Sequence, residues 1–485
     1  MGLSAVGISW PALGAEKEKQ SAVKQIEPLG GQPAPGSKSS VADLDYQVKY
    51  QRAFEAVIWA VPALGIYGFT KGFNALGLKP NEIIAYAKPA TPHLEALTIN
   101  NQVPYIFAYT DLRDGPVVLE IPAATEEATL YGQIVDCWQV TVGDVVSPGI
   151  DRGKSGKYLL LPPGYDKPIS DGYFPIQTSS FRIYLAFRSV PGLKGNLEKA
   201  ATYARAIKMY PLSRAENPPE TTFLDPGDQR FPTLPAYDES AFKDIYDIVS
   251  VEPVRPRDKI MMGMLASIGI EPGKPFNPDE KTRKAMKAAI VDAYFYLRQR
   301  FENPRTELLY WPDRKYINYL ASVDANGGFT YETSTSLSTE DRAWIYFVGT
   351  YYPNKIAAHP TAIYLSPYAD AAGKALQAGK TYRITIPKDV PVGQFWSVIV
   401  YDAADFAFIY SQQMLTGLSS FDLPSMKLNK DESVTIYIGP KAPAGFASNW
   451  IPTEGKKPLP MIRFYSPTER FWNKSFKLPD FELVS

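Results

Sequence analysis

The pattern of hydrophobic and polar positions divides the chain into two strand-rich regions around a helical middle. Between about residues 80 and 187, short apolar–polar alternations are separated by turn clusters such as Asp111–Pro116. A period of two over four to eight residues is typical of β-strands. The same period returns after residue 325, most clearly in Val434–Ile438. Many short strands at short spacing predict β-sandwiches.

Helical spacing of three and four marks several other segments. We expect a helix over 43–59, a break at Pro62 and a second short helix after it, because proline removes a helical hydrogen bond. Asn196 is a predicted N-cap for a helix that reaches Met209. Asn277 is predicted to cap the clearest helix, which continues to about Phe301, and another helix starts at Ser338.

These patterns predict four parts. They are a leader over 1–42, a β-sandwich with N-terminal helices over 43–190, a helical linker domain over 191–325 and a second sandwich over 326–485. The first fifteen residues are apolar and end in small residues, like the back half of a secretory signal that lacks its basic start. We therefore expect a periplasmic or secreted protein. No later segment is expected to span a membrane.

Composition removes several function classes. The 51 basic and 51 acidic residues balance, so no broad cationic surface is available and nucleic acid is not an expected partner. One cysteine and two histidines exclude an internal disulfide, a thiolate metal cluster and a site with three imidazoles. No serine-elbow, zinc-peptidase or dinucleotide motif occurs, and we expect no cofactor and no metal. The 31 tyrosines fit either a large β core or an aromatic-lined cleft.

Three charged residues stand out because they are embedded in apolar strands. Asp136 follows Ile134–Val135, Asp402 follows the strand that begins at Phe395, and Arg463 lies within Met461–Tyr465. A buried charge is costly unless it is paired or functional. One interpretation is a set of structural ion pairs and turn caps. The other is a polar cleft with a carboxylate acid/base pair and an arginine for an anionic or carbonyl group.

Longer motifs resemble a known pair of domains. Those similar to the DUF1254 region are Asn100–Tyr105, Asp111–Val117, Tyr131–Trp138 and Gly156–Tyr165, and those similar to the DUF1214 region are Phe395–Asp402, Ser448–Pro452 and Arg463–Pro467. The resemblance covers roughly residues 43–480. It implies a mainly β protein with an α insert: an N-terminal immunoglobulin-like β-sandwich, a small helical domain and a C-terminal jelly-roll β-sandwich. The family is named for unknown function, and its members often carry export signals.

Three functions remain open. The first is a hydrolase or lyase that acts on a small or glycan-like substrate in a cleft between the two β domains. Its predicted residues are the acid/base pair Asp136 and Asp402, the substrate-orienting Tyr401, Arg463 and Arg342, and a stacking wall of Trp396 and Trp450. The second is a non-catalytic carbohydrate- or small-ligand-binding or assembly protein, with homo-oligomerisation left open. The third is a structural role for the charged strand residues.

Overall fold

A computed structural model describes residues 31–34, 36–146, 149–192, 194–325, 329–350 and 362–484. The chain divides into two compact units, Met1–Val48 and Lys49–Ser485, and the first five residues of the first helix belong to the first unit. The signal-like residues 1–15 lie outside the described ranges. The fourfold division expected from the sequence stays a prediction.

The first helix, α1, is continuous from Leu44 to Ala75 and contains Pro62, so the predicted break is wrong. Every residue from 56 to 66 is buried, and an apolar helix that is enclosed on all sides is held by packing despite one lost hydrogen bond. Gly68 and Gly72 let other backbone approach it closely. An added Cβ at Gly68 would lie 1.8 Å from the carbonyl oxygen of Thr233.

By length and composition α1 could also cross a membrane. It is the one helix in the described ranges that passes this test, and 83 % of its most apolar 18-residue window is buried inside the protein. A buried core helix passes the same test. The expectation that no segment spans a membrane therefore stays a prediction.

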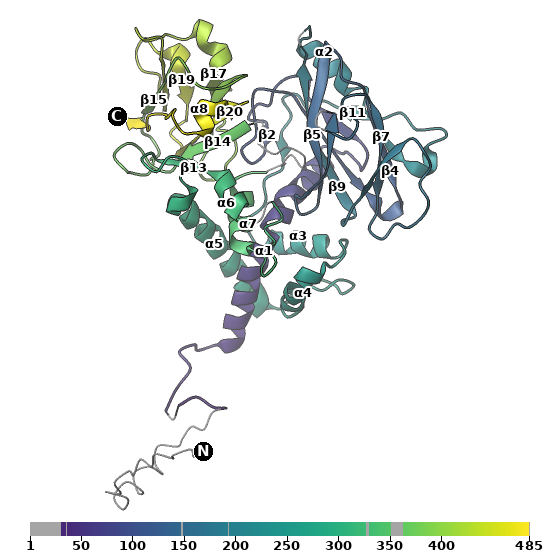
Figure 1. Ribbon diagram of the computed structural model, residues 1–485. Coiled ribbons are helices and arrows are strands. Elements are labelled where there is room, and N and C mark those ends of the chain that lie inside the picture. Colours follow the sequence, from purple (N-terminus) through teal and green to yellow (C-terminus); the bar gives the residue numbers. More distant parts are fainter. Residues whose placement is uncertain are drawn as a thin grey trace, which may run out of the picture. The chain divides into compact units, whose positions relative to one another are not determined.

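The first β domain, blue to teal in Figure 1, contains a six-stranded sheet of order β11-β1-β3-β9-β5-β6 and a four-stranded sheet of order β10-β4-β7-β8. Ile106, Leu119, Leu160 and Phe187 belong to the core of this domain. The strands are β1 (Ile83–Ala85), β3 (Tyr105–Asp111), β4 (Val117–Ile121), β5 (Ala128–Asp136), β6 (Thr141–Val146), β7 (Gly156–Leu161), β8 (Tyr173–Gln177), β9 (Arg182–Pro191), β10 (Lys208–Pro211) and β11 (Phe223–Leu224), beside a small parallel pair of β2 (Leu94–Glu95) and β12 (Phe231–Pro232).

Helices occupy the middle of the chain. They are α2 (Leu197–Ala204), α3 (Ser240–Val249), α4 (Lys259–Ala266), α5 (Glu280–Glu302), α6 (Tyr319–Ala325) and α7 (Thr339–Val348), with 3-10 helices η3 (Leu212–Arg214), η4 (Pro256–Asp258) and η5 (Thr306–Leu308). Another 3-10 helix, η2 (Leu112–Asp114), joins β3 to β4 in the first β domain. The Asn196 cap is confirmed, because its Oδ1 accepts a hydrogen bond from Lys199 N at 2.9 Å. The predicted end at Met209 is wrong, because β10 pairs with β4 there. The α5 cap is Asp279, which accepts from Thr282 N, and not Asn277.

The second β domain, green to yellow in Figure 1, again has two sheets, of order β13-β14-β20-β16-β17 and β19-β18-β15-β21. Its core contains Trp396, Ile436, Ile451 and Phe471. Its elements are β13 (Tyr316–Asn318), β14 (Ala362–Pro367), β15 (Tyr382–Ile386), β16 (Trp396–Asp402), β17 (Gly417–Ser419), η6 (Ser420–Ser425), β18 (Val434–Gly439), η7 (Ala447–Asn449), β19 (Trp450–Pro452), β20 (Pro458–Tyr465), α8 (Glu469–Trp472) and β21 (Glu482–Leu483). The predicted class, mainly β with a helical insert and sandwich-like domains, is confirmed.

Strand alternation gives the five-stranded sheet two different faces. Val398 and Ile462 point into the core of the second β domain. Ile399, Tyr401 and Met461 belong instead to a larger core that also includes α1, α7 and one face of the six-stranded sheet. Successive residues of a strand point to opposite faces. The second face of this sheet therefore packs toward the first β domain and the helices.

Candidate functional site

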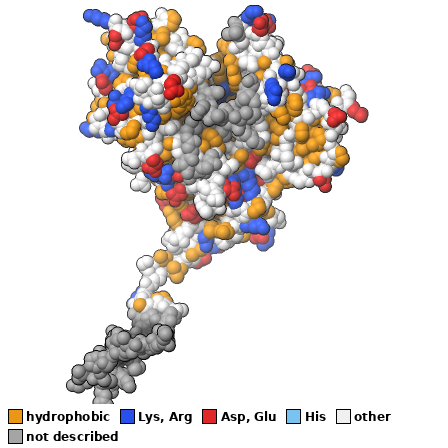
Figure 2. Space-filling view, viewed as in Figure 1, with side chains coloured by type: hydrophobic (Ala, Val, Ile, Leu, Met, Phe, Trp, Pro, Cys, Tyr) orange, Lys and Arg blue, Asp and Glu red, His pale blue; other side chains and the backbone are white. Residues whose placement is uncertain are grey.

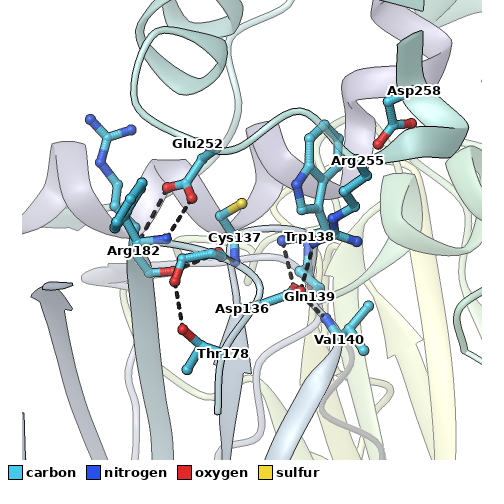
Figure 3. Close-up of polar contacts among 12 residues, drawn as sticks. Asp136, Cys137, Trp138, Gln139, Val140, Thr178, Arg182, Glu252, Arg255 and Asp258 are labelled. Carbon is cyan, nitrogen blue, oxygen red and sulfur yellow. Dashed lines mark hydrogen bonds and ion pairs between the residues drawn. The ribbon is translucent and has the colours of Figure 1, made fainter. Parts of the chain in front are cut away.

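Asp136, the first predicted catalytic carboxylate, caps the turn between β5 and β6. Its Oδ1 accepts hydrogen bonds from Trp138 N at 2.8 Å and Val140 N at 2.9 Å, and its Oδ2 accepts from Arg255 Nη2 at 2.8 Å (Figure 3). Gln139 supplies the tight turn with a φ of 59°. Both carboxylate oxygens are therefore engaged by backbone and an ion pair, in a residue that is only 1 % exposed.

Glu252 is a second buried carboxylate near this turn. It accepts hydrogen bonds from Phe181 N at 2.7 Å and Arg182 N at 3.1 Å, which ties the helical middle to β9 (Figure 3). Burial raises its pKa above the ordinary value, and the two backbone bonds oppose that rise only in part. Burial also raises the pKa of the Cys137 thiol, so this cysteine is a small buried residue and not an activated nucleophile.

Asp402, the second predicted catalytic carboxylate, lies in a different polar cluster. It ends β16, where Oδ1 accepts from Ala404 N at 2.9 Å and Oδ2 pairs with Lys456 Nζ at 3.1 Å. In the described parts of the chain, no residue hydrogen-bonds to the side chains of both Asp136 and Asp402. Like Asp136, Asp402 is occupied as a turn cap with a cationic partner.

The two tryptophans predicted as a stacking wall lie on different sheets. Trp396 on β16 is buried in the core of the second β domain. Trp450 on β19 donates its indole N–H to the carbonyl oxygen of Gly439 at 2.9 Å. These positions give no support to a shared stacking surface.

Tyr401 and Arg463, by contrast, are in direct contact. Arg463 is 2 % exposed, and its Nη2 donates to the Tyr401 hydroxyl and to the carbonyl oxygen of Thr98, both at 2.6 Å. The Tyr401 hydroxyl in turn donates to the carbonyl oxygen of Ile99 at 2.6 Å. The guanidinium lies 4.8 Å from the ring centroid of Tyr364. Contacts to residues 98 and 99 place this pair where the second β domain meets the first.

A second arginine, Arg188, belongs to the same polar group and was not predicted from the sequence. Arg188 faces Tyr105 across the β3–β9 pair, with its guanidinium 5.4 Å from the Tyr105 ring centroid. Asn100 links the two domains, because its backbone N donates to the Tyr105 hydroxyl at 3.2 Å and its Nδ2 donates to the Tyr465 hydroxyl at 2.7 Å. We name the seam cluster by its six members, Tyr105, Arg188, Tyr364, Tyr401, Arg463 and Tyr465.

The seam cluster is rich in hydrogen-bond donors. Nε and Nη1 of Arg463 are buried without any partner, and no carboxylate among the described residues forms an ion pair with Arg463 or Arg188. Burial raises the pKa of Tyr401 and of Tyr465, so both hydroxyls are neutral and can donate at neutral pH. Two cations therefore share a site in which no described side chain carries a negative charge.

Arg342, the remaining predicted residue, lies near the Asp136 turn. It is 2 % exposed, and its Nη2 donates to the carbonyl oxygen of Trp59 at 2.9 Å. Its guanidinium is 5.9 Å from the ring centroid of Trp138. Of the predicted residues, the structure thus brings Tyr401 to Arg463 and Arg342 to the surroundings of Asp136. Within the described ranges, no group of three or more His, Cys, Asp or Glu could hold a metal ion.

Comparisons with known proteins match the two motif regions. Residues 80–211 match the DUF1254 family and residues 361–469 match the DUF1214 family, both described as proteins of unknown function. No curated protein gives a significant match. The VPA0106 protein from Vibrio parahaemolyticus has a similar fold, with a TM-score of 0.53 and 18 % identity over 90 % of this chain and 100 % of that chain.

An uncharacterised protein from Burkholderia cenocepacia is also matched. Its TM-score is 0.36 at 11 % identity, over 91 % of this chain and 96 % of that one. The DUF1254 and DUF1214 matches cover the motifs quoted from the sequence, in the same order along the chain. The chain therefore contains a DUF1254 region followed by a DUF1214 region.

Proposed function

We propose that this protein binds a small anionic ligand, such as an acidic sugar, at the seam cluster without catalysing its conversion. The observation that carries the proposal is the state of Arg463. Arg463 is buried, two of its nitrogens lack hydrogen-bond partners, and none of the described carboxylates neutralises it. A buried cation of this kind is unfavourable unless another group supplies negative charge.

The unused hydrogen-bond donors of the seam cluster support a ligand that offers hydrogen-bond acceptors. The hydroxyls of Tyr105 and Tyr465 each accept a bond from Asn100, which leaves their own hydrogens to be donated. Arg463 adds the N–H groups of Nε and Nη1. A carboxylate offers only acceptors, and arginine is the side chain best suited to bind it. The chemistry of the cluster is therefore complementary to an oxyanion and not to a cation.

Aromatic faces support a ring-shaped ligand. Tyr105 and Tyr364 each carry a guanidinium over the ring, and the ring of Tyr465 stacks on Phe395 with centroids 4.0 Å apart. Flat amphipathic side chains of this kind suit sugars and other planar molecules. Arg188, Tyr364 and Tyr465 are only partly buried, so solvent reaches the edge of the cluster.

Binding fits the geometry better than hydrolysis or elimination. Acid/base catalysis needs a titratable group within hydrogen-bonding reach of the substrate. Asp136 and Asp402 are each occupied as turn caps with basic partners, and the seam cluster has no carboxylate or imidazole among its six members. The hydrolase or lyase function remains the competing proposal. The envelope location also remains a proposal, and it rests on the apolar start of the sequence.

Isothermal titration calorimetry with galacturonate tests the binding proposal. Galactose, which lacks the carboxylate, is the matched ligand control. We expect galacturonate to bind and galactose not to bind. Arg463→Gln should weaken galacturonate binding by at least about tenfold, because truncating one partner of a buried charge pair typically costs more than 2 kcal/mol. The exposed arginine Arg113, paired with Asp111, gives the control Arg113→Gln, which should leave affinity unchanged.

Three results would overturn the proposal. Equal affinity of the wild type and Arg463→Gln, with both folded by circular dichroism, would remove the site. Turnover of a glycan that is abolished in a folded Asp136→Asn variant would favour the hydrolase or lyase instead. A library of other small carboxylates is screened by the same titration if galacturonate itself does not bind, and failure of all of them also rejects the proposal.

A further inference from the structure

We propose a second, independent anion site, for a phosphate-type oxyanion, at three arginines beside Trp138. We name this group the arginine triad, and its members are Arg255, Arg257 and Arg342. It lies where the turn after β5 meets η4 and α7, away from the contacts that define the seam cluster.

Contacts with two tilted tryptophan rings position Arg255 and Arg342, and Arg257 lies beside Asp258. The guanidinium of Arg255 lies 5.4 Å from the Trp138 ring centroid, and that of Arg342 lies 5.9 Å from it. The rings of Trp138 and Trp59 have centroids 4.6 Å apart, and Arg342 also donates to the Trp59 carbonyl oxygen. Figure 3 shows Arg255 beside Trp138 with Asp258 nearby. Aromatic faces hold guanidinium groups in place while leaving their N–H groups free to donate.

The same three arginines have unsatisfied donors. In each of them Nε is buried and has no hydrogen-bond partner. The Nε of Arg257 has only a distant ion-pair contact, 3.9 Å from Asp258 Oδ2, and Asp258 Oδ1 already accepts from the Trp59 indole. Buried donors are nearly always satisfied in native proteins, so three on neighbouring arginines indicate a missing acceptor.

The number of donors favours a tetrahedral ion. One oxygen can accept two bonds, as Oδ1 of Asp136 does, but an ion with three or more oxygens offers a separate oxygen to each of the three N–H groups. A carboxylate provides two oxygens, whereas phosphate and sulfate provide four. Arginine binds phosphate through several charge-assisted hydrogen bonds. A phosphate-type ion is therefore the occupant that we assign to these donors.

The ion pairs of the three arginines also favour an anion at the triad. Asp136 pairs with Arg255 and Glu332 pairs with Arg257, but no described carboxylate lies within ion-pair distance of Arg342. Burial, and then repulsion by Arg257, lowers the pKa of Arg342 to about 10, although Asp258 partly opposes the shift. An oxyanion at this place would satisfy the Nε donors and neutralise Arg342 together.

Solvent can reach the triad from one side. The side chains of Arg255 and Arg257 are 16 % and 14 % exposed, and that of Glu332 is 48 % exposed. Glu332 is bound to Arg257 at 2.6 Å and is the most exposed of the acidic partners. An entering oxyanion would therefore compete with Glu332 for Arg257.

Titration of the full chain with inorganic phosphate tests this inference, with sulfate as a second arm and chloride at matched ionic strength as the control. We expect phosphate or sulfate to bind the wild type and chloride not to. Arg257→Gln should weaken binding by about tenfold or more. Glu332→Gln should tighten it by up to about fivefold, because it removes a half-exposed competitor. Arg113→Gln, which changes an exposed arginine paired with Asp111, should leave phosphate affinity unchanged.

The inference is overturned if no heat of binding is measured up to millimolar phosphate, or if Arg257→Gln is folded and binds as tightly as the wild type. Loss of phosphate binding in Arg463→Gln, with retention in Arg257→Gln, assigns the anion to the seam cluster and also rejects the triad. If Arg257→Gln does not fold, Glu332→Gln decides: tighter binding supports the triad, and unchanged or weaker binding rejects it.

Discussion

Replacement of Asp136 by Asn separates a structural from a catalytic role for this carboxylate. The substitution keeps an oxygen for the backbone N–H groups of Trp138 and Val140 but removes the charge that pairs with Arg255. Breaking a fully buried ion pair from one side costs about 3–5 kcal/mol. Because the Arg255 side chain is 16 % exposed and can be partly rehydrated, we expect a loss of about 2–4 kcal/mol.

Urea denaturation followed by tryptophan fluorescence measures this loss as a lower midpoint with an unchanged slope. The control is Glu126→Gln, which removes an exposed ion pair with Lys194. Surface pairs contribute about 0–1 kcal/mol, so the control midpoint should scarcely move. A folded Asp136→Asn variant with the stability of the wild type would refute the structural assignment and restore Asp136 as a free acid.

Three further predictions concern the fold. Gly68→Ala should destabilise the protein by about 1–3 kcal/mol or more, because the new Cβ would meet the backbone of Thr233. Gly263→Ala, in helix α4 where the new Cβ meets no other atom, should stabilise the protein by about 0.5–1 kcal/mol. Thermal melts compare the two variants. Asn196→Ala should cost about 0.5–2 kcal/mol through the lost α2 cap, measured by urea denaturation. The raised pKa of Glu252 contributes stability that is full below about pH 4.5 and is lost as the pH rises through the folded-state pKa. The difference in unfolding free energy between wild type and Glu252→Gln should therefore shrink from pH 4.5 to neutrality, and a growing difference would contradict this sign.

Local patterning was sufficient to predict most elements of the fold. The alternation over Val434–Ile438 identified β18, and the capping side chain of Asn196 identified the start of α2. Local rules failed where tertiary packing or pairing decides. Pro62 should end a helix by its own chemistry, yet the enclosed position of α1 keeps the helix continuous. Gly68 and Gly72 are the sequence signal for this packing, because glycines four residues apart lie on one helix face and let another segment of backbone approach it closely.

The candidate site was only partly accessible to sequence reasoning. A charged residue in an apolar strand is visible in the sequence, which is why Arg463 and Asp136 were singled out. Whether such a charge is paired depends on contacts that are distant along the chain, such as Arg255 for Asp136. Arg188 also lies in an apolar strand, β9, but it joins the seam cluster only through the pairing of β9 with β3. Sequence patterns can therefore nominate a buried charge but cannot find its partner.

A crystal structure of the protein soaked with galacturonate tests the central claim most directly. We expect the sugar carboxylate to lie within about 3 Å of Nε or Nη1 of Arg463, with Tyr465 or Arg188 as a second contact. A structure in which Arg463 is instead neutralised by an aspartate or glutamate of the chain, with the carboxylate bound elsewhere or absent, would contradict the proposal that this cluster awaits an external anion.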